Sequence, residues 1–167
     1  MIKFKDLWRS HPLNKSERFP CRIGGFPTYR NQCAIRMSIA LKGAGVTYDM
    51  MPKGLAMCRA HPREEMHYIR AEELARALVR ANIPGLGKVE ILKDPKNYYR
   101  DLFGRTGIML IRNYWFRTGE TKHASGDHID VWNGKRSASA WLINWFFWAG
   151  YYGNYDKATE IWFWEVK

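Results

Sequence analysis

The chain has 167 residues, which suffices for one hydrophobic core but not for two domains of ordinary size, so we expect a single domain over residues 1–167. Its 46% hydrophobic and 15% aromatic residues exclude a disordered chain, and no apolar run reaches the roughly 20 residues that a membrane-spanning helix needs. A net charge of +11 attracts polyanions such as nucleic acid or an anionic cell envelope, although the basic residues are scattered and fit a solvated surface equally well.

Residues 1–30 are rich in proline, glycine and charge, a composition that predicts loops with one short helix. The first six residues have neither the basic nor the apolar segment of a secretory signal peptide. If the protein acts outside the cytoplasm, we therefore expect it to leave the cell by a route other than general export.

Two helices are predicted next. Residues 33–44 are small or apolar on nearly every face, which is typical of a buried central helix. Asn31 is a preferred capping residue at its start, and Gly43 and Gly45 favour its end. The second helix is predicted for residues 61–81, where apolar side chains recur at three-to-four spacing until the sequence Asn-Ile-Pro-Gly.

The second half of the chain changes to the pattern of strands. Short β-rich runs occur at residues 107–112, 128–132 and 161–166, and the second of them precedes an Asn-Gly turn. Helices followed by strands favour an α+β fold over a regularly alternating α/β fold.

Cys33 is the first candidate for chemistry. It lies two positions after Asn31, so its sulfur would sit among the unpaired N–H groups at the positive end of the helix. Such a setting lowers the pKa of a thiol below about 8.5, and the same N–H groups can stabilise an oxyanion. Cys33 is therefore either a nucleophile or an ordinary core residue.

A nucleophilic thiol needs a base, a role that histidine fills near neutral pH. His11 and His61 precede prolines in expected turns. His67 would lie on the outer face of the second helix, and His123 in a polar loop. His128 alone opens a predicted strand, where a rigid ladder can hold its ring, so it is the expected base unless it is merely solvated.

The two remaining cysteines, Cys21 and Cys58, do not form a Cys-x-x-Cys pair, so we expect no metal site. They either form a disulfide in an oxidising compartment or remain buried thiols.

Two segments resemble the signature segments of the fourth family of type VI secretion amidase effectors. They are Asn-Gln-Cys-Ala-Ile-Arg-Met-Ser at 31–38, followed by Gly-Val at 45–46, and Gly-Asp-His-Ile-Asp-Val-Trp-Asn-Gly at 126–134. Gly-Ile-Met at 107–109 also fits. The resemblance implies a papain-like fold of the NlpC type, with a buried N-terminal helix packed on a small antiparallel sheet.

The resemblance also implies a function. Such effectors are antibacterial toxins, held in the producer's cytoplasm and then injected by the type VI secretion machinery into the periplasm of a rival cell. There they act as cysteine peptidoglycan amidases, DL-endopeptidases that hydrolyse the γ-D-glutamyl to meso-diaminopimelate bond of the stem peptide. A cognate immunity protein blocks the site. The chemistry requires no metal or organic cofactor, and we expect no nucleic acid partner.

Carried over by position, Cys33 is the nucleophile and His128 the general base. Family members carry an aspartate after the Asn-Gly that follows the histidine, but residues 135–140 contain no acid here. Asp130 shares a strand face with His128 and is the expected third residue, unless it pairs with an arginine. Ser139 as a neutral acceptor, or no third residue at all, are the alternatives.

Three further interpretations stay open. Gln32 either polarises the substrate carbonyl or points away, and the aromatic residues between 141 and 152 either fill the core or border a binding groove. The basic charge and the aromatic residues also fit a nucleic-acid-binding module. Finally, the missing downstream aspartate fits an inactive adaptor that keeps a papain-like fold.

Overall fold

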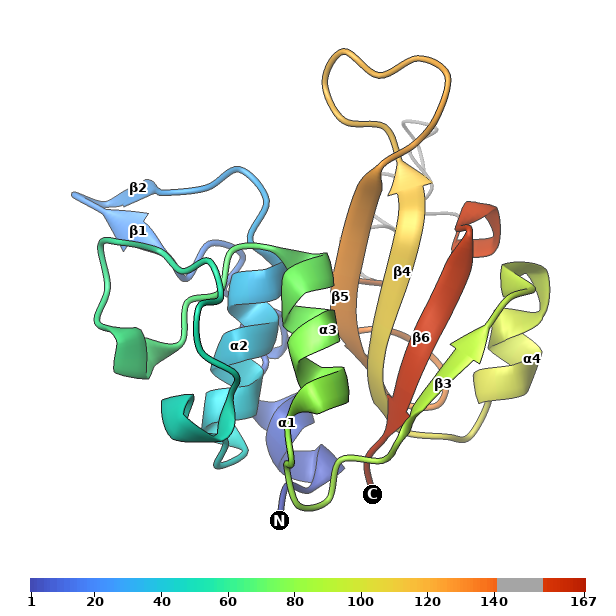
Figure 1. Ribbon diagram of the computed structural model, residues 1–167, viewed down its shortest axis with the longest axis horizontal. Coiled ribbons are helices and arrows are strands. Elements are labelled where there is room, and N and C mark those ends of the chain that lie inside the picture. The colour runs from blue at the N-terminus through green and yellow to red at the C-terminus, as the bar shows by residue number, and fades with distance from the viewer. Residues whose placement is uncertain (141–154) are drawn as a thin grey trace.

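The computed structural model of the chain is built around a four-stranded antiparallel sheet in the order β3-β6-β4-β5 (Figure 1). The strands are β3 (Val89–Leu92), β4 (Gly107–Trp115), β5 (Gly126–Trp132) and β6 (Glu160–Glu165). The three expected strands are confirmed. β3 escaped prediction because it is a short edge strand whose central residues, Glu90 and Ile91, are exposed.

The structure describes residues 1–140 and 155–167. The aromatic residues between 141 and 152, for which the sequence left two interpretations open, lie outside the described residues.

The segment before the buried helix contains α1 (Phe4–Ser10), a 3-10 turn (Pro12–Lys15) and a hairpin of two short strands, β1 (Arg22–Ile23) and β2 (Phe26–Pro27). The expectation of loops with one short helix is therefore confirmed, with the hairpin as an addition.

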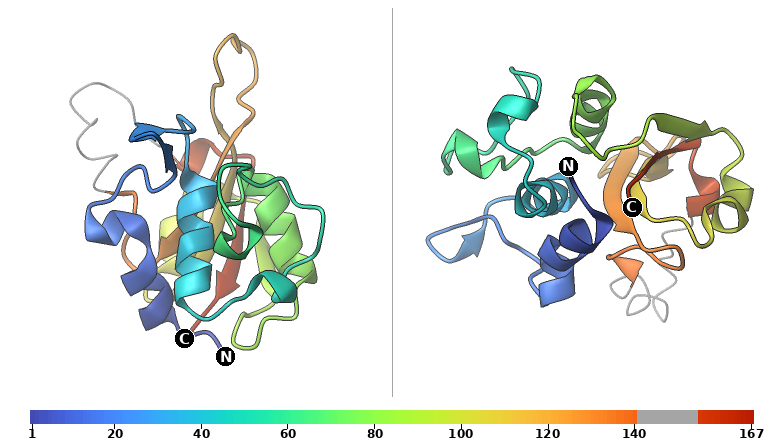
Figure 2. Two further views of the ribbon diagram at one scale, coloured as in Figure 1. Left: turned by 90° about the vertical axis from the view of Figure 1, so that its left-hand side faces the viewer. Right: turned by 90° about the horizontal axis from the view of Figure 1, so that it is seen from below.

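Helix α2 (Cys33–Gly43) is the buried helix that the sequence predicts, and it packs against β5. Figures 1 and 2 show α1, α2 and α3 (Ala71–Arg80) gathered on the β5 side of the sheet, while α4 (Tyr98–Leu102) lies at the opposite, β3 side. The α+β fold with a buried N-terminal helix on an antiparallel sheet is thus confirmed. This packing brings the first turn of α2 next to β5.

Helix α3 begins ten positions later than the predicted helix of residues 61–81. The preceding segment is irregular, because Met66 has a left-handed backbone with φ 58° and Tyr68 bridges to Met57 in a short antiparallel pair. His67, expected on an outer helix face, is therefore buried, with 5% of its surface exposed. The acidic first turn of α3 is Glu72 and Glu73, whereas Glu64 and Glu65 lie in a short 3-10 turn before it.

The two ends of the chain lie side by side, as Figure 1 shows. The N–H of Phe4 donates to the carbonyl of Lys167 at 2.9 Å, and that of Ile2 donates to the carbonyl of Pro84 at 2.7 Å.

Of the helices in residues 1–140 and 155–167, none combines the length and the hydropathy that crossing a bilayer requires.

Candidate active site

Cys33 is the first residue of α2, and only 5% of its surface is exposed. The side-chain oxygen of Asn31 accepts a hydrogen bond from the Cys33 N–H at 3.1 Å. Gln32 rather than Asn31 occupies the cap position, but Asn31 still satisfies one of the free N–H groups of the first turn. The sulfur is thereby fixed at the positive end of a buried helix.

The side chain of Gln32 is turned toward the β1–β2 hairpin. Its amide makes a two-way pair with the backbone of Cys21, accepting from the N–H at 2.9 Å and donating to the carbonyl at 2.8 Å, and it donates to Tyr29 at 3.1 Å. Of the two interpretations for Gln32, the one in which it points away from the thiol fits these contacts. It anchors the hairpin to the residue before Cys33.

His128 lies on β5, which packs against α2, and its ring is close enough to the Cys33 sulfur for each group to shift the pKa of the other. Nε2 faces a different pair of groups, at 3.3 Å from Asp130 Oδ2 and 3.0 Å from Ser139 Oγ. Because Nε2 is engaged there, Nδ1 is the nitrogen left to face the thiol. The imidazole therefore bridges a sulfur and a carboxylate.

Asp130 is almost fully buried, with 1% of its surface exposed, and it is held by several donors. It accepts hydrogen bonds from the N–H of Val131 at 2.8 Å, from the N–H of Ser139 at 2.8 Å and from the Ser139 hydroxyl at 2.5 Å. Burial alone would raise its pKa, but the hydrogen bond from His128, the nearby imidazoles and Ser139 hold it well below its usual range. The structure therefore brings together both sequence candidates for the third position, with the Ser139 hydroxyl donating to Asp130.

The charges of Cys33 and His128 favour an ion pair. Burial alone would raise the pKa of the Cys33 thiol, but the hydrogen bond and charge of His128, the N–H of Ile129 and the charge of Arg36 outweigh it and lower the pKa. Burial likewise opposes the imidazolium, yet hydrogen bonds to Asp130 and Cys33 raise the pKa of His128 to about 9. Both shifts favour the thiolate–imidazolium pair over the neutral pair.

Two buried residues near this pair were not singled out by the sequence. His11, expected in an ordinary turn, ends α1 with 1% exposure, and its Nε2 lies 3.4 Å from Asp130 Oδ1. Burial, with Arg36 and His128 adding repulsion, lowers the pKa of His11 to about 4 although Asp130 opposes the shift. The other residue is Arg36, whose guanidinium donates to the Arg18 carbonyl at 2.9 Å. In the sequence, the only indication of a special role for Arg36 is that it is a charged residue inside a mainly apolar helix.

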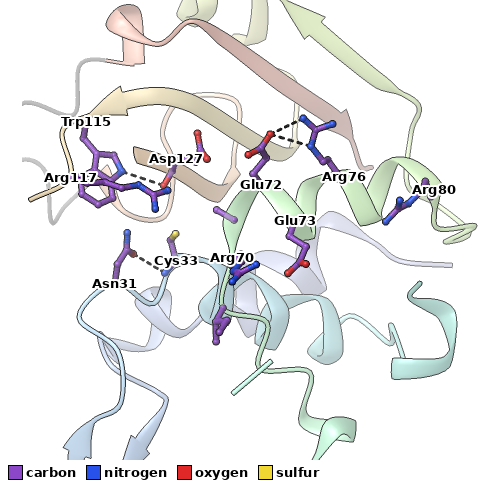
Figure 3. A pocket seen from close by; sticks show the side chains of 12 residues that line it. Asn31, Cys33, Arg70, Glu72, Glu73, Arg76, Arg80, Trp115, Arg117 and Asp127 are labelled. Carbon is purple, nitrogen blue, oxygen red and sulfur yellow. Dashed lines mark hydrogen bonds and ion pairs between the residues drawn. The ribbon is translucent and has the colours of Figure 1, made fainter. Parts of the chain in front are cut away.

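A cavity of about 470 Å³ opens at Cys33 (Figure 3). Its wall carries both signs of charge, from Arg70, Glu72, Glu73, Arg76, Arg80, Arg117 and Asp127. Figure 3 shows Cys33 between Asn31 and Arg70, with Trp115 and Asp127 across the cavity from them. Within the described part of the chain, Arg70 and Arg80 pair with no carboxylate of the protein. The cavity can therefore bind a ligand with carboxylate groups beside the thiol.

An irregular step in β4 shapes the wall opposite Cys33. The pairing of β4 with β5 shifts between Ile111 and Trp115, and Asn113 there has a left-handed φ of 51° and donates its N–H to Asp127 at 3.0 Å. The Trp115 ring packs so closely on Gly126 that a Cβ at Gly126 would overlap it. A glycine at this position thus lets the indole form the cavity wall, with its N–H donating to the Asp127 carbonyl at 3.2 Å.

A buried helix that starts at a cysteine, facing a histidine on an antiparallel strand, defines a papain-like α+β protein. Within that class, the chain belongs to the family of type VI secretion system (T6SS) amidase effector protein 4, Tae4, whose family model matches residues 29–164. The family that the two sequence segments indicate is therefore confirmed, and with it the assignment as a T6SS amidase effector.

Solved structures agree with the fold. The type VI effector Tae4 from Enterobacter cloacae is 16% identical, with 100% of this chain and 98% of that chain covered and a TM-score of 0.66. Tae4 from Salmonella typhimurium, in its effector–immunity structure with Tai4, is 16% identical, with 100% and 99% covered and a TM-score of 0.56. The same Salmonella effector in complex with the immunity Tai4 from Enterobacter cloacae is 18% identical, with 83% and 84% covered and a TM-score of 0.55. The search of curated proteins found no match.

Proposed function

We propose that this effector is a cysteine peptidoglycan amidase in which Cys33 is the nucleophile, His128 the general base and acid, and Asp130 the residue that orients His128. The observation that carries the proposal is that His128, held by Asp130 at 3.3 Å, lies near enough to Cys33 to lower the pKa of the thiol, beside an open cavity that Cys33 lines. The bond proposed is that between γ-D-glutamate and meso-diaminopimelate in the stem peptide.

The reaction is a two-step acyl transfer. The Cys33 thiolate attacks the γ-carbonyl carbon, and the tetrahedral intermediate collapses as the His128 imidazolium donates its proton to the departing diaminopimelate amine. The neutral imidazole then takes a proton from water, whose oxygen attacks the thioester. The products are a stem ending in a free glutamate carboxylate and the regenerated thiolate–imidazolium pair.

Asn31 is the side chain that we assign to the oxyanion, because Gln32 is engaged with Cys21. Its oxygen accepts from the Cys33 N–H, so its NH₂ group remains a donor, and the residue lines the cavity beside the thiol (Figure 3). A donor held in place before the reaction stabilises the developing negative charge without reorganisation. The N–H groups of the first turn of α2 add to the same field.

The charges of the cavity support a stem peptide as substrate. The free α-carboxylate of D-glutamate and the carboxylate of diaminopimelate can pair with Arg70 and Arg80, which have no acidic partner in the described residues. The ammonium group of diaminopimelate can pair with Asp127 or Glu73 on the same wall. This arrangement of both signs suits a zwitterionic peptide better than a uniform polyanion.

The family and its solved relatives support the biological setting. The Salmonella Tae4 structures hold an effector with an immunity protein, so we propose that a cognate immunity protein covers the cavity in the producing cell. The proposed site of action is the periplasm of the target cell, with the producer's cytoplasm as the site before delivery. We also propose that residues 1–167 act as one domain, a view that the contacts between the two ends support.

Digestion of purified Gram-negative peptidoglycan, followed by mass analysis of the muropeptides, tests the activity. The native chain should release stems ending at glutamate, and Cys33→Ala should lose turnover by roughly 10⁴-fold or more, because a catalytic triad acts as a unit. Lys42→Ala, at the exposed far end of the same helix, is the matched control and should retain full activity. Equal products from Cys33→Ala and the native chain would overturn the proposal and leave the inactive adaptor.

A further inference from the structure

A second group of sulfur and nitrogen atoms lies outside the proposed catalytic site. It joins Cys21, next to the β1–β2 hairpin, to Cys58 and His61 in the loop before α3. The two Sγ atoms are 3.5 Å apart, and His61 Nδ1 is 3.5 Å from each of them. Both cysteines are buried, with 0% and 3% exposure. The three candidate ligand atoms lie close enough together to contact one metal ion.

This triangle has the dimensions of one face of a tetrahedral metal site. With Zn–S bonds of about 2.3 Å and Zn–N bonds of about 2.0–2.1 Å, tetrahedral geometry separates neighbouring ligand atoms by about 3.5–3.8 Å. The two S–N edges of 3.5 Å match the expected S–N separation, and the S–S edge of 3.5 Å is about 0.3 Å shorter than the expected S–S separation, a difference that a small rotation of either cysteine side chain removes. A disulfide would require the two sulfurs at about 2.05 Å and would leave the His61 nitrogen without a role in the cluster.

We propose that Cys21, Cys58 and His61 bind a thiophilic divalent cation of the zinc type. The fourth position falls to Glu65, whose carboxylate is close to His61 and sufficiently exposed to change rotamer. This metal site is separate from the catalytic residues, so a failure to bind metal would not affect the proposed amidase function. The expectation of no metal site was based on the absence of a Cys-x-x-Cys pair. Cys58 and His61, at Cys-x-x-His spacing, instead provide two ligands from one loop, and Cys21 provides the third from a distant part of the chain.

Groups around the triangle are arranged to support bound thiolates. The Thr28 hydroxyl is 3.4 Å from Cys21 Sγ. Such outer contacts orient ligands and neutralise part of their charge. A further independent sign is His67, which packs against His61 with ring centroids 4.2 Å apart and the rings tilted by 41°, and whose buried Nδ1 has no hydrogen-bond partner in the described residues.

The position of the triangle gives the cation a structural role. Cys21 is tied through its backbone to the Gln32 side chain, and Gln32 immediately precedes Cys33. A cation held by Cys21 and the 58–61 loop would therefore fix two otherwise separate loops against the start of α2. The expected role is to stiffen the support of the nucleophile rather than to take part in the reaction.

Cobalt(II) titration of the reduced, metal-free full chain tests the site, because cobalt reports its ligands by absorption. The native chain should develop a thiolate-to-cobalt charge-transfer band and the visible bands of tetrahedral cobalt, saturating at one equivalent and displaced by Zn²⁺. Cys58→Ser should lose most of the charge-transfer intensity. Cys33→Ala removes the third cysteine of the chain and is the matched control, which should keep the whole spectrum.

His61→Asn is a second test of the site, in case Cys58→Ser does not fold. It should keep the charge-transfer band, shift the visible bands and weaken Zn²⁺ binding by more than the roughly 10- to 100-fold that loss of an outer partner causes. A folded native chain that binds no cobalt would overturn the site, as would equal spectra from the native chain and Cys58→Ser. So would a Cys21–Cys58 disulfide that forms equally fast with and without one equivalent of Zn²⁺.

Discussion

The two cysteine–histidine groups lie on either side of Gln32, yet their surroundings differ in one decisive respect. At Cys33 a single sulfur meets a histidine whose far nitrogen is held by the Asp130 carboxylate. At Cys21 and Cys58 two sulfurs converge on one nitrogen of His61. A carboxylate behind the imidazole stabilises its protonated form and favours proton transfer, whereas a second sulfur in front of it favours a shared cation.

Removing the carboxylate should have the largest effect on this contrast. Asp130→Asn leaves a neutral side chain behind His128, so the ring loses the charge that stabilises its protonated form. We expect kcat for peptidoglycan to fall by about 10⁴-fold, as when a triad aspartate is replaced elsewhere. Cobalt binding at the other group should be unchanged in the same variant. An activity loss below tenfold would show that Ser139 alone suffices to orient the ring.

Replacing the proposed oxyanion donor should have the next largest effect. Asn31→Ala removes the side-chain NH₂ group beside Cys33, and kcat should fall by roughly 10²–10³-fold with little change in KM. Asn31→Asp keeps the acceptor for the Cys33 N–H but replaces the donor with a charge, so it should be no more active than Asn31→Ala. If Asn31→Asp instead restored activity, the residue would act only as a helix cap.

His11 should affect the stability of the fold rather than the rate of the reaction. Its folded pKa of about 4 lies below the usual 6.5, so only the unfolded chain gains a proton as the pH falls between these values. The contribution of His11 to stability should be complete above pH 6.5 and should fall by up to about 3 kcal/mol as the pH approaches 4. Asp130, Arg36 and His128 are the charged groups that face this ring.

Urea unfolding at a series of pH values measures this loss. His11→Gln should flatten the slope between pH 6.5 and 4, while His123→Gln, in an exposed loop, should leave it as in the native chain. The same slope in His11→Gln and the native chain would mean that His11 is not the group responsible.

The pH dependence of the rate should show the smallest but most specific effect. The imidazolium of His128 persists up to its pKa of about 9, so kcat/KM should fall on the alkaline side only near that value. Alkylation of Cys33 by iodoacetamide should report a thiolate that forms at a lower pH than that of an ordinary thiol. In Asp130→Asn the alkaline limb should move to lower pH, because the hydrogen bond that raises the His128 pKa is weakened. An alkaline limb that stays in place would remove Asp130 from that role.

The sequence predicts what is local and misses what is assembled from distant parts. Helix α2 and strand β5 follow from residues that are adjacent in the chain, and so does the common strand face of His128 and Asp130. The start of α3 was misplaced because apolar spacing continues through His67, where tertiary contacts and a left-handed residue override it. His11 could not be placed beside Asp130, because no periodicity relates α1 to β5. The contact of Cys21 with Cys58 is of the same kind, since it depends on how two loops meet.

The hydrogen bond between Phe4 and Lys167 brings the two ends of the chain together at the foot of the molecule, while α2 presents Cys33 at its upper end (Figure 1). The old termini could therefore be joined by a short linker and the chain reopened in an exposed loop, giving a circular permutant with an unaltered cavity. For the same reason, a reporter domain fused to either end would lie at the end of the molecule opposite Cys33 and leave the cavity accessible.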